Sequence, residues 1–163
     1  MRTIFKLTIL LIPLTVNAQR FLLKSESVIF SFDTQNGKHA VLAKDVDNSY
    51  IVYRYGTTDS VEFEFPEKNK DSWKKFKYSY YLRGGGTQNE GMDLNYMYFN
   101  NNGYRYKIYD TYYAIQNKSE IGISVTNLKT NKIIDIKGAK KTRKGTLTDF
   151  RNNNLVEILD MDQ

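Results

Sequence analysis

The sequence predicts an all-β protein whose strands are mostly antiparallel. The chain contains 13 Tyr and 9 Phe but only 2 Pro, and aromatic side chains favour the pleated, half-buried face of a sheet. Apolar residues also alternate with polar ones, as in Val61 to Phe65 with Glu62 and Glu64 between them, and a period of two is that of a strand. Turns rich in Asn and Gly separate these runs. Together these observations predict a meander of about eight strands that forms a single barrel or a sandwich.

The first residues, MRTIFKLTILLIPLTVNA, have the pattern of a cleavable secretory signal peptide. Arg2 and Lys6 give a positive start, a short apolar run follows, and small or branched residues end at Ala18, where a signal peptidase would cut. The apolar run is broken by Pro13 and is shorter than the roughly 20 residues that a membrane-spanning helix needs. We therefore expect residues 1–18 to be removed; an uncleaved anchor or a buried first element is the alternative.

Residues 19–163 are expected to form a single β domain that is secreted or periplasmic. This length can bury a core of its own. The chain contains no Cys, so thiol chemistry is excluded and packing must supply the stability. The 24 basic and 18 acidic side chains give a formal net charge of +6, which is too mild an excess for a dedicated nucleic-acid binder. No other apolar stretch is long enough to cross a bilayer, so we expect no transmembrane segment in the mature chain.

The positions of the strands follow from the alternation and from the turn residues. Asn36-Gly37, Asn102-Gly103 and the segment 127–131 fall between alternating runs, and Asn and Gly tolerate the positive φ that tight hairpin turns require. The strands are expected near residues 27–33, 38–44, 49–55, 60–65, 74–83, 92–99, 104–115 and 120–137, the last range holding two strands.

The most regular segment, YIVYRYGTTDSVEFEFPE at residues 50–67, is expected to be a hairpin. In a regular strand Tyr53 and Tyr55 share one face, whereas Tyr50 shares the other face with Arg54. We expect the aromatic rows to line the core. The alternative is a surface platform of aromatic rings, because Tyr can bury its ring and leave the hydroxyl in water.

The end of the chain is less regular than the rest. Residues 137–144 form a basic stretch that reads as a loop, and apolar residues then recur at Leu147, Phe150 and Leu159. This spacing is compatible with a last strand over 154–159 or with a short C-terminal helix, and it does not decide between them.

The residue types argue against most catalytic chemistry. His39 is the only histidine, whereas metal sites and nucleophilic triads draw on several His or Cys ligands. No GxSxG, HExxH or Walker pattern occurs in the sequence, so no metal and no cofactor are expected. Glu62 and Glu64 lie on one strand face about 7 Å apart, which leaves a glycan hydrolase with an acid pair as an alternative.

Two kinds of segment are candidate binding sites. Three glycines follow Arg83, and their amides could form an anion-binding nest or a mobile binding loop; a flexible link between strands is the alternative. Basic clusters surround Trp73 and occupy the stretch 137–144, and such clusters attract acidic surfaces, anionic glycans or lipid head groups. An exposed Trp could in addition stack on a sugar. The candidate binding residues are Trp73, Arg83, Gly84, Gly85, Gly86, Lys140, Lys141 and Arg143.

The chain resembles a group of small secreted bacterial β proteins. The resemblance rests on KHAVLA at 38–43, on YIVYRYG at 50–56, on EFEFP at 62–66 and on the later run FKYSYYLR, less than a third of the mature chain. Several members of the group carry a cysteine after the first of these segments, where this chain has Ala43 and Lys44, so any disulfide of theirs is absent. The group has no assigned activity. The resemblance therefore implies export and a β fold, and it implies no site.

The expected function is that of an exported, non-catalytic binding protein of the bacterial envelope or the extracellular space. An inhibitor or interaction module fits best, because rigid strands present preformed loops at low ordering cost. The expected contact surface is the Gly84–Gly86 loop together with the Trp73 region, and the partner is an envelope protein or an anionic glycan. A carbohydrate- or lipid-binding module that uses Trp73, surface Tyr and the lysines is the alternative, besides the hydrolase.

Overall fold

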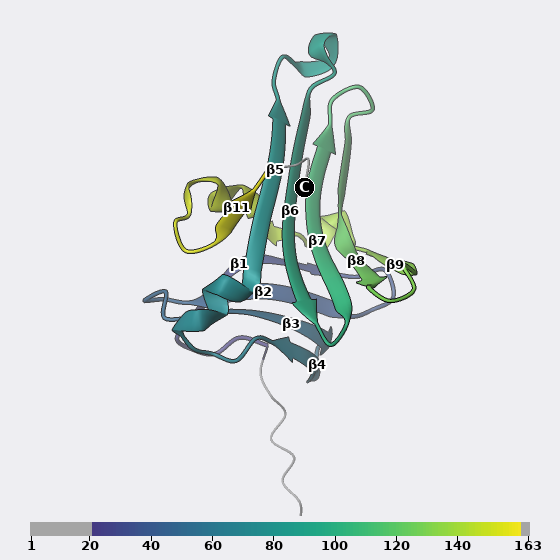
Figure 1. Cartoon of the computed structure of the whole chain (residues 1–163). Helices are drawn as coiled ribbons and strands as arrows, with labels where there is room; N and C mark the ends of the chain where they lie inside the picture. Colours follow the sequence, from purple (N-terminus) through teal and green to yellow (C-terminus); the bar gives the residue numbers. More distant parts are fainter. Residues whose placement is uncertain (1–20, 161–163) are drawn as a thin grey trace, which may run out of the picture.

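The computed structural model describes residues 21–160 and folds them into two β-sheets of five and six strands (Figure 1). The signal peptide expected over residues 1–18 lies outside the described residues. The two sheets face each other across one apolar core and do not close into a barrel. Of the two architectures that the sequence left open, the sandwich is therefore the one that forms.

The five-stranded sheet consists of four antiparallel strands in chain order and one short strand added beside the first. Its order is β10-β1-β2-β3-β4. The added strand, β10, pairs with β1 through only two residues on each strand. The strands are β1 (Glu26–Asp33), β2 (His39–Asp45), β3 (Ile51–Thr57), β4 (Ser60–Phe65) and β10 (Lys144–Gly145).

The six-stranded sheet is a meander of long hairpins with the order β11-β5-β6-β7-β8-β9. Asn102 and Gly103 close the turn from β6 to β7 with φ values of 47° and 78°, the two positive values of a type I′ hairpin turn. The strands are β5 (Phe76–Arg83), β6 (Met92–Asn101), β7 (Tyr104–Tyr113), β8 (Lys118–Asn127), β9 (Ile133–Lys137) and β11 (Glu157–Leu159).

The prediction of an all-β, mostly antiparallel fold is confirmed, and the expected strand ranges agree with the observed ones to within a few residues. Three features differ. β11 pairs parallel to β5, the basic stretch contains the short strand β10, and the end of the chain forms both a turn of 3₁₀ helix, η4 (Leu147–Asn152), and a strand. The three remaining 3₁₀ turns are η1 (Lys70–Lys75), η2 (Gly86–Asn89) and η3 (Lys140–Thr142).

Aromatic rings from both sheets form the centre of the core. Phe99 of β6 lies 4.7 Å from Phe65 of β4 and 4.6 Å from Tyr106 of β7, measured between ring centroids, and both pairs are stacked. Tyr53 of β3 approaches the same ring to 5.4 Å. The inward row of the segment 50–67 therefore lines the core as predicted, while Tyr50 and Arg54 lie on the opposite face.

The C-terminal segment, residues 138–160, ties the two sheets together. Gly138 forms an isolated bridge with Thr34, and the chain then crosses to β1 as β10 before it returns to β5 as β11. Between these strands η4 inserts Leu147 and Phe150, which are 0% and 2% exposed, into the core. The segment thus closes one side of the sandwich.

One end of the six-stranded sheet extends beyond the sandwich. The strands of the two sheets cross steeply, and the β5–β6 and β7–β8 hairpins continue past the five-stranded sheet at the top of Figure 1. We call residues 80–93 and 110–119 the projecting end. Within residues 21–160, no helix is long and apolar enough to span a membrane.

Candidate functional site

The structure does not bring the predicted site residues together. Trp73 lies in η1 just before β5, whereas Arg83 is the last residue of β5 and the three glycines follow it. A strand rises about 3.3 Å per residue, so the eight residues of β5 keep the two groups about 25 Å apart. The expected joint surface of the Gly84–Gly86 loop and the Trp73 region therefore does not form.

The expectation that Trp73 is an exposed stacking platform is wrong. The side chain is 3% exposed, and its indole Nε1 donates a hydrogen bond of 2.9 Å to the carbonyl oxygen of Asn48. The η1 turn directs Ser72 and Trp73 inward, and the Ser72 hydroxyl accepts a hydrogen bond from the amide of Ile51. The lysines near Trp73 in the sequence are exposed to solvent, whereas the indole ring itself is buried.

The basic side chains of the stretch 137–144 lie in two different environments. Lys140 and Lys141 are exposed in η3, where that turn lies against β1 and β8. Arg143, by contrast, turns back toward the six-stranded sheet and forms an ion pair of 2.9 Å with Asp110, whose side chain is 5% exposed.

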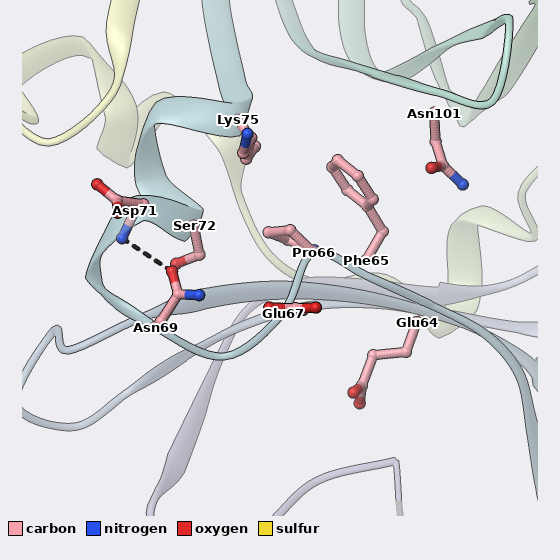
Figure 2. A pocket seen from close by; sticks show the side chains of 9 residues that line it. All are labelled: Glu64, Phe65, Pro66, Glu67, Asn69, Asp71, Ser72, Lys75 and Asn101. Atoms are coloured by element: carbon pink, nitrogen blue, oxygen red, sulfur yellow. Dashed lines mark hydrogen bonds between the residues drawn. The ribbon is translucent and has the colours of Figure 1, made fainter.

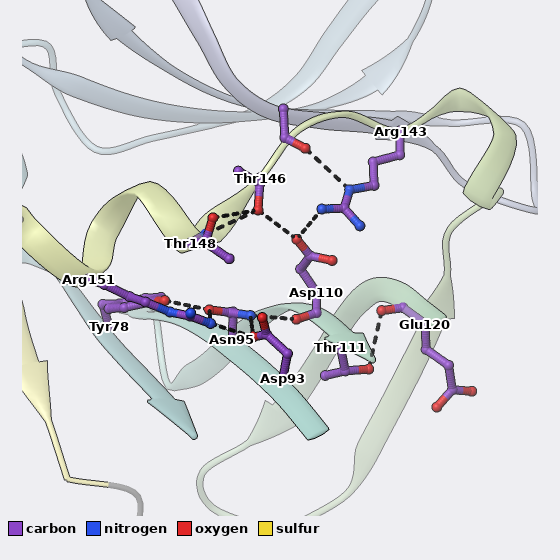
Figure 3. A network of polar contacts seen from close by, with 11 residues as sticks. Tyr78, Asp93, Asn95, Asp110, Thr111, Glu120, Arg143, Thr146, Thr148 and Arg151 are labelled. Carbon is purple, nitrogen blue, oxygen red and sulfur yellow. Dashed lines mark hydrogen bonds and ion pairs between the residues drawn. The ribbon is translucent and has the colours of Figure 1, made fainter. Parts of the chain in front are cut away.

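Arg143 belongs to a polar network that joins the C-terminal segment to β6 and β7 (Figure 3). Thr146 also donates a hydrogen bond to Asp110, at 3.3 Å. Burial raises the pKa of Asp110, and the charge of Arg143 only partly offsets this effect. Figure 3 shows Arg151 on the other side of the network, where its guanidinium contacts Asp93 and donates a hydrogen bond of 2.9 Å to Asn95.

The contacts of this network assign it a structural role. Both arginines come from the C-terminal segment, and both aspartates come from the sheet. Arg151 also lies over the ring of Tyr80, with 5.0 Å between the guanidinium carbon and the ring centroid. Each carboxylate of the pair Asp93 and Asp110 is thus held by a guanidinium, and together they fasten the segment across the inner face of the sheet.

A shallow pocket of about 520 Å³ opens beside η1 (Figure 2). Phe65 and Pro66 give it an apolar wall, and carboxylates lie on its rim. Two of these carboxylates are already paired, Glu64 with Arg54 and Lys68, and Asp71 with Lys74. The full lining is Glu64, Phe65, Pro66, Glu67, Asn69, Asp71, Ser72, Lys75 and Asn101.

The acid pair Glu62 and Glu64 does not have the geometry of a catalytic pair. Glu62 forms an ion pair with Lys38, and only Glu64 lines the pocket. Cations therefore hold both carboxylates. The structure gives no support to a glycan hydrolase at these residues.

The projecting end gathers exposed apolar side chains that the sequence analysis did not single out. Leu82 and Ile115 are 57% and 60% exposed. Tyr80 and Tyr112 face the same side of the sheet as Leu82, because β5 and β7 both pair with β6 in this register. The members of this apolar group are Tyr80, Leu82, Tyr112 and Ile115, whereas Tyr81 faces the opposite side of the sheet.

The tip of the projecting end is held by its own hydrogen bonds. Arg83 donates two hydrogen bonds, of 2.9 and 2.7 Å, to the carbonyl oxygen of Glu90, and Asn89 donates one to the carbonyl oxygen of Gly84. The amide of Ala114 donates to the carbonyl oxygen of Gly91 and so links the two hairpins. The guanidinium of Arg83 is therefore engaged by Glu90 within the loop, and the predicted binding role of Arg83 and Gly84–Gly86 stays a prediction.

A buried ion cluster lies on the outer face of the five-stranded sheet. Arg54 donates hydrogen bonds of 2.6 and 2.8 Å to the two carboxylate oxygens of Glu26, and their side chains are 1% and 0% exposed. Glu64 accepts a further hydrogen bond of 2.6 Å, and the carbonyl oxygen of Phe21 accepts one of 2.9 Å. The cluster fixes residues 21–26 against the sheet.

Stability is expected to fall in acid because of this cluster. Burial alone would raise the pKa of Glu26, but hydrogen bonds from Arg54, the Leu23 amide and Tyr50 outweigh it and hold the pKa below its ordinary value of 4.5. A lowered folded-state pKa stabilises the protein above the unfolded pKa, and this stabilisation is lost as the pH falls through the folded value. Urea unfolding between about pH 7 and about pH 3 should give a shallower pH dependence for Glu26→Gln than for wild type. Identical slopes would contradict this assignment.

Comparison with protein-family models, with curated proteins and with solved structures found no match. The resemblance to small secreted bacterial β proteins stays a prediction. The geometry of residues 21–160 is thus the basis on which a function can be proposed.

Proposed function

We propose that the chain is an exported, non-catalytic interaction module that binds a partner protein through the projecting end. The observation that carries this proposal is the apolar group on that end. Four large apolar side chains, Tyr80, Leu82, Tyr112 and Ile115, each 37–60% exposed, lie on two hairpins that extend past the sandwich. Contiguous exposed apolar surface of this kind is typical of protein interaction sites.

The shape of the projecting end favours a partner with a cleft. The two hairpins form a narrow protrusion (Figure 1), and the hydrogen bonds of Arg83 and Asn89 hold its tip in one conformation. A preformed protrusion loses little conformational entropy when it binds. These properties suit an inhibitor that enters the substrate cleft of an enzyme, such as one that attacks the cell wall, or the cleft of a toxin.

The absence of a catalytic role is part of the proposal. Two candidate carboxylate pairs, Glu62 with Glu64 and Asp93 with Asp110, are held by Lys or Arg. His39 is engaged with Asp33 at 2.7 Å on the other sheet. Asp93 and Asp110 lie at the base of the projecting end, and each is paired with an arginine.

The variant Leu82→Ser/Tyr112→Ser is expected to lose partner recovery from an envelope extract, because it replaces two apolar contacts of the projecting end with polar ones. The matched control is Ile133→Ser/Ile134→Ser, which makes the same kind of change on β9, where these residues are 62% and 56% exposed. Recovered proteins are compared by mass spectrometry. Recovery of the same partner by both double variants at the wild-type level would remove the projecting end as the binding surface.

A further inference from the structure

The outer face of the six-stranded sheet carries a second set of side chains that the proposed function does not use. The register makes Ser79, Tyr96, Tyr109 and Gly122 one row across four strands. Along each strand, every second residue counted from this row points away from the core. The residues between them point into the core, among them Tyr78, Met97, Ile108 and Ile123. The tyrosines that face outward are Tyr81, Tyr96, Tyr98, Tyr109 and Tyr113.

Several rings on this face contact a neighbouring ring or lie against the sheet. Tyr96 and Tyr98 lie 6.2 Å apart between ring centroids. Tyr109 lies across Gly122, where a Cβ atom would come within 2.3 Å of the Tyr109 hydroxyl oxygen. That hydroxyl donates a hydrogen bond of 3.0 Å to Asp135 on β9. The glycine thus makes room for a ring that would otherwise stand away from the sheet.

The charge on this face is strongly asymmetric. Six outward positions of the strands are basic and three, Glu120, Asp135 and Glu157, are acidic. The ammonium groups lie over the rings: Lys107 Nζ is 5.3 Å from the ring centroid of Tyr96, and Lys137 Nζ is 5.5 Å from that of Tyr109. The basic side chains are Lys77, Arg83, Arg105, Lys107, Lys118 and Lys137.

Two basic side chains of β7 on this face, Arg105 and Lys107, differ from the others because no carboxylate of the described residues neutralises them. Lys77, Arg83, Lys118 and Lys137 form ion pairs at its margins, whereas neither Arg105 nor Lys107 forms an ion pair within residues 21–160. Burial raises the pKa of Tyr96 and of Tyr109 to about 12.

We propose that this outer face binds an anionic polysaccharide, with the half-buried rings of Tyr96 and Tyr98 against the sugars and Arg105 and Lys107 against their acidic groups. Aromatic rings offer an apolar surface with a polar hydroxyl, and flanking basic groups attract a polyanion. The charge excess favours an anionic chain over a neutral one. The expected export favours a polysaccharide over a nucleic acid. This surface lies on the opposite side of the sheet from Tyr80, Leu82 and Tyr112, and the inference shares with the proposed function only the expected export.

The test is retention of the purified protein on dextran sulfate beads, with neutral dextran beads as the reference. Wild type is expected to bind dextran sulfate, to release as salt is raised because exposed charges are screened, and to pass through neutral dextran. Tyr98→Ser and Lys107→Gln should each weaken binding by about fivefold, the size expected for loss of one ring or one charge contact. A wild-type near-ultraviolet circular dichroism spectrum confirms that a variant has folded.

Two control variants separate a built surface from attraction by net charge alone. Tyr104→Ser removes a tyrosine that is 41% exposed at an inward-facing position of β7, and Lys129→Gln removes one exposed charge from the turn between β8 and β9. Both should bind like wild type. Equal weakening by Lys129→Gln and Lys107→Gln, with none by Tyr98→Ser, would overturn the proposal. Tighter binding of an oligothymidylate than of dextran sulfate would also overturn it, since the face would then be a nucleic-acid surface.

Discussion

Arg54→Met is expected to lower the free energy of unfolding by about 3–5 kcal/mol, the cost of removing one partner of a buried ion pair. Methionine fills a similar volume but offers no donor. It would leave the carboxylate of Glu26, whose side chain is 0% exposed, without its two hydrogen bonds from Arg54. Glu64 and the Phe21 carbonyl oxygen would each lose one further bond.

Urea unfolding at neutral pH measures this change, and Arg105→Met is the matched control. Arg105 lies exposed on the other sheet, so its replacement should change the free energy of unfolding by no more than about 0.5 kcal/mol. If Arg54→Met were as stable as Arg105→Met, the cluster would not hold residues 21–26 against the sheet. The loss of stability in acid that is assigned to Glu26 would then have no explanation either.

Phe99→Ala is expected to cost about 3–5 kcal/mol, as for other deletions of a large aromatic side chain from a core. Phe99 is 2% exposed and is the ring on which both sheets converge. Five other rings lie within 6.3 Å of it between centroids. Three of these belong to the five-stranded sheet and two to the six-stranded sheet: Tyr53, Phe63, Phe65, Phe76 and Tyr106.

The control for this variant is Tyr104→Ala, which removes an exposed ring at the end of the same hairpin. It should change stability by no more than about 0.5 kcal/mol. A thermal or urea unfolding curve of Phe99→Ala that overlaid the Tyr104→Ala curve would mean that the two sheets are not held together through these rings.

The strands could be predicted because their signals are local. The alternation of Phe63 and Phe65 with glutamates marks the strand β4. Asn102-Gly103 supplies the two positive φ values that the turn from β6 to β7 requires. The inward row of Tyr53 follows from the same period. Each of these features depends only on neighbouring residues, so no knowledge of the rest of the fold is needed.

The buried cluster of Arg54 could not be predicted in the same way. Its partners come from β1 and β4, and its cover comes from residues 21–25. Which side chains meet on an outer face depends on strand register and on where a remote segment returns. The parallel pairing of β11 with β5 has the same origin, because 73 residues (84–156) separate the two strands in sequence.

The candidate site was predictable only in part. The run of glycines marks a loop, and the structure has a loop there, but exposure of Leu82 and Tyr112 depends on how far the opposite sheet reaches. Their alternation reads as core in the sequence, and they are uncovered because the six-stranded sheet extends past its partner. Trp73 is the converse case, since a turn inside a lysine-rich stretch buries it.

Photocrosslinking tests most directly whether the projecting end binds a partner. A photoreactive benzoylphenylalanine replaces Leu82 in one variant and Ile133, on β9, in another, and each protein is irradiated in envelope extract. We predict that the Leu82 variant forms one defined adduct, that excess unlabelled wild type suppresses it, and that the Ile133 variant forms none. Adducts of the same partner from both positions, or an adduct at Leu82 that wild type does not suppress, would contradict the proposal.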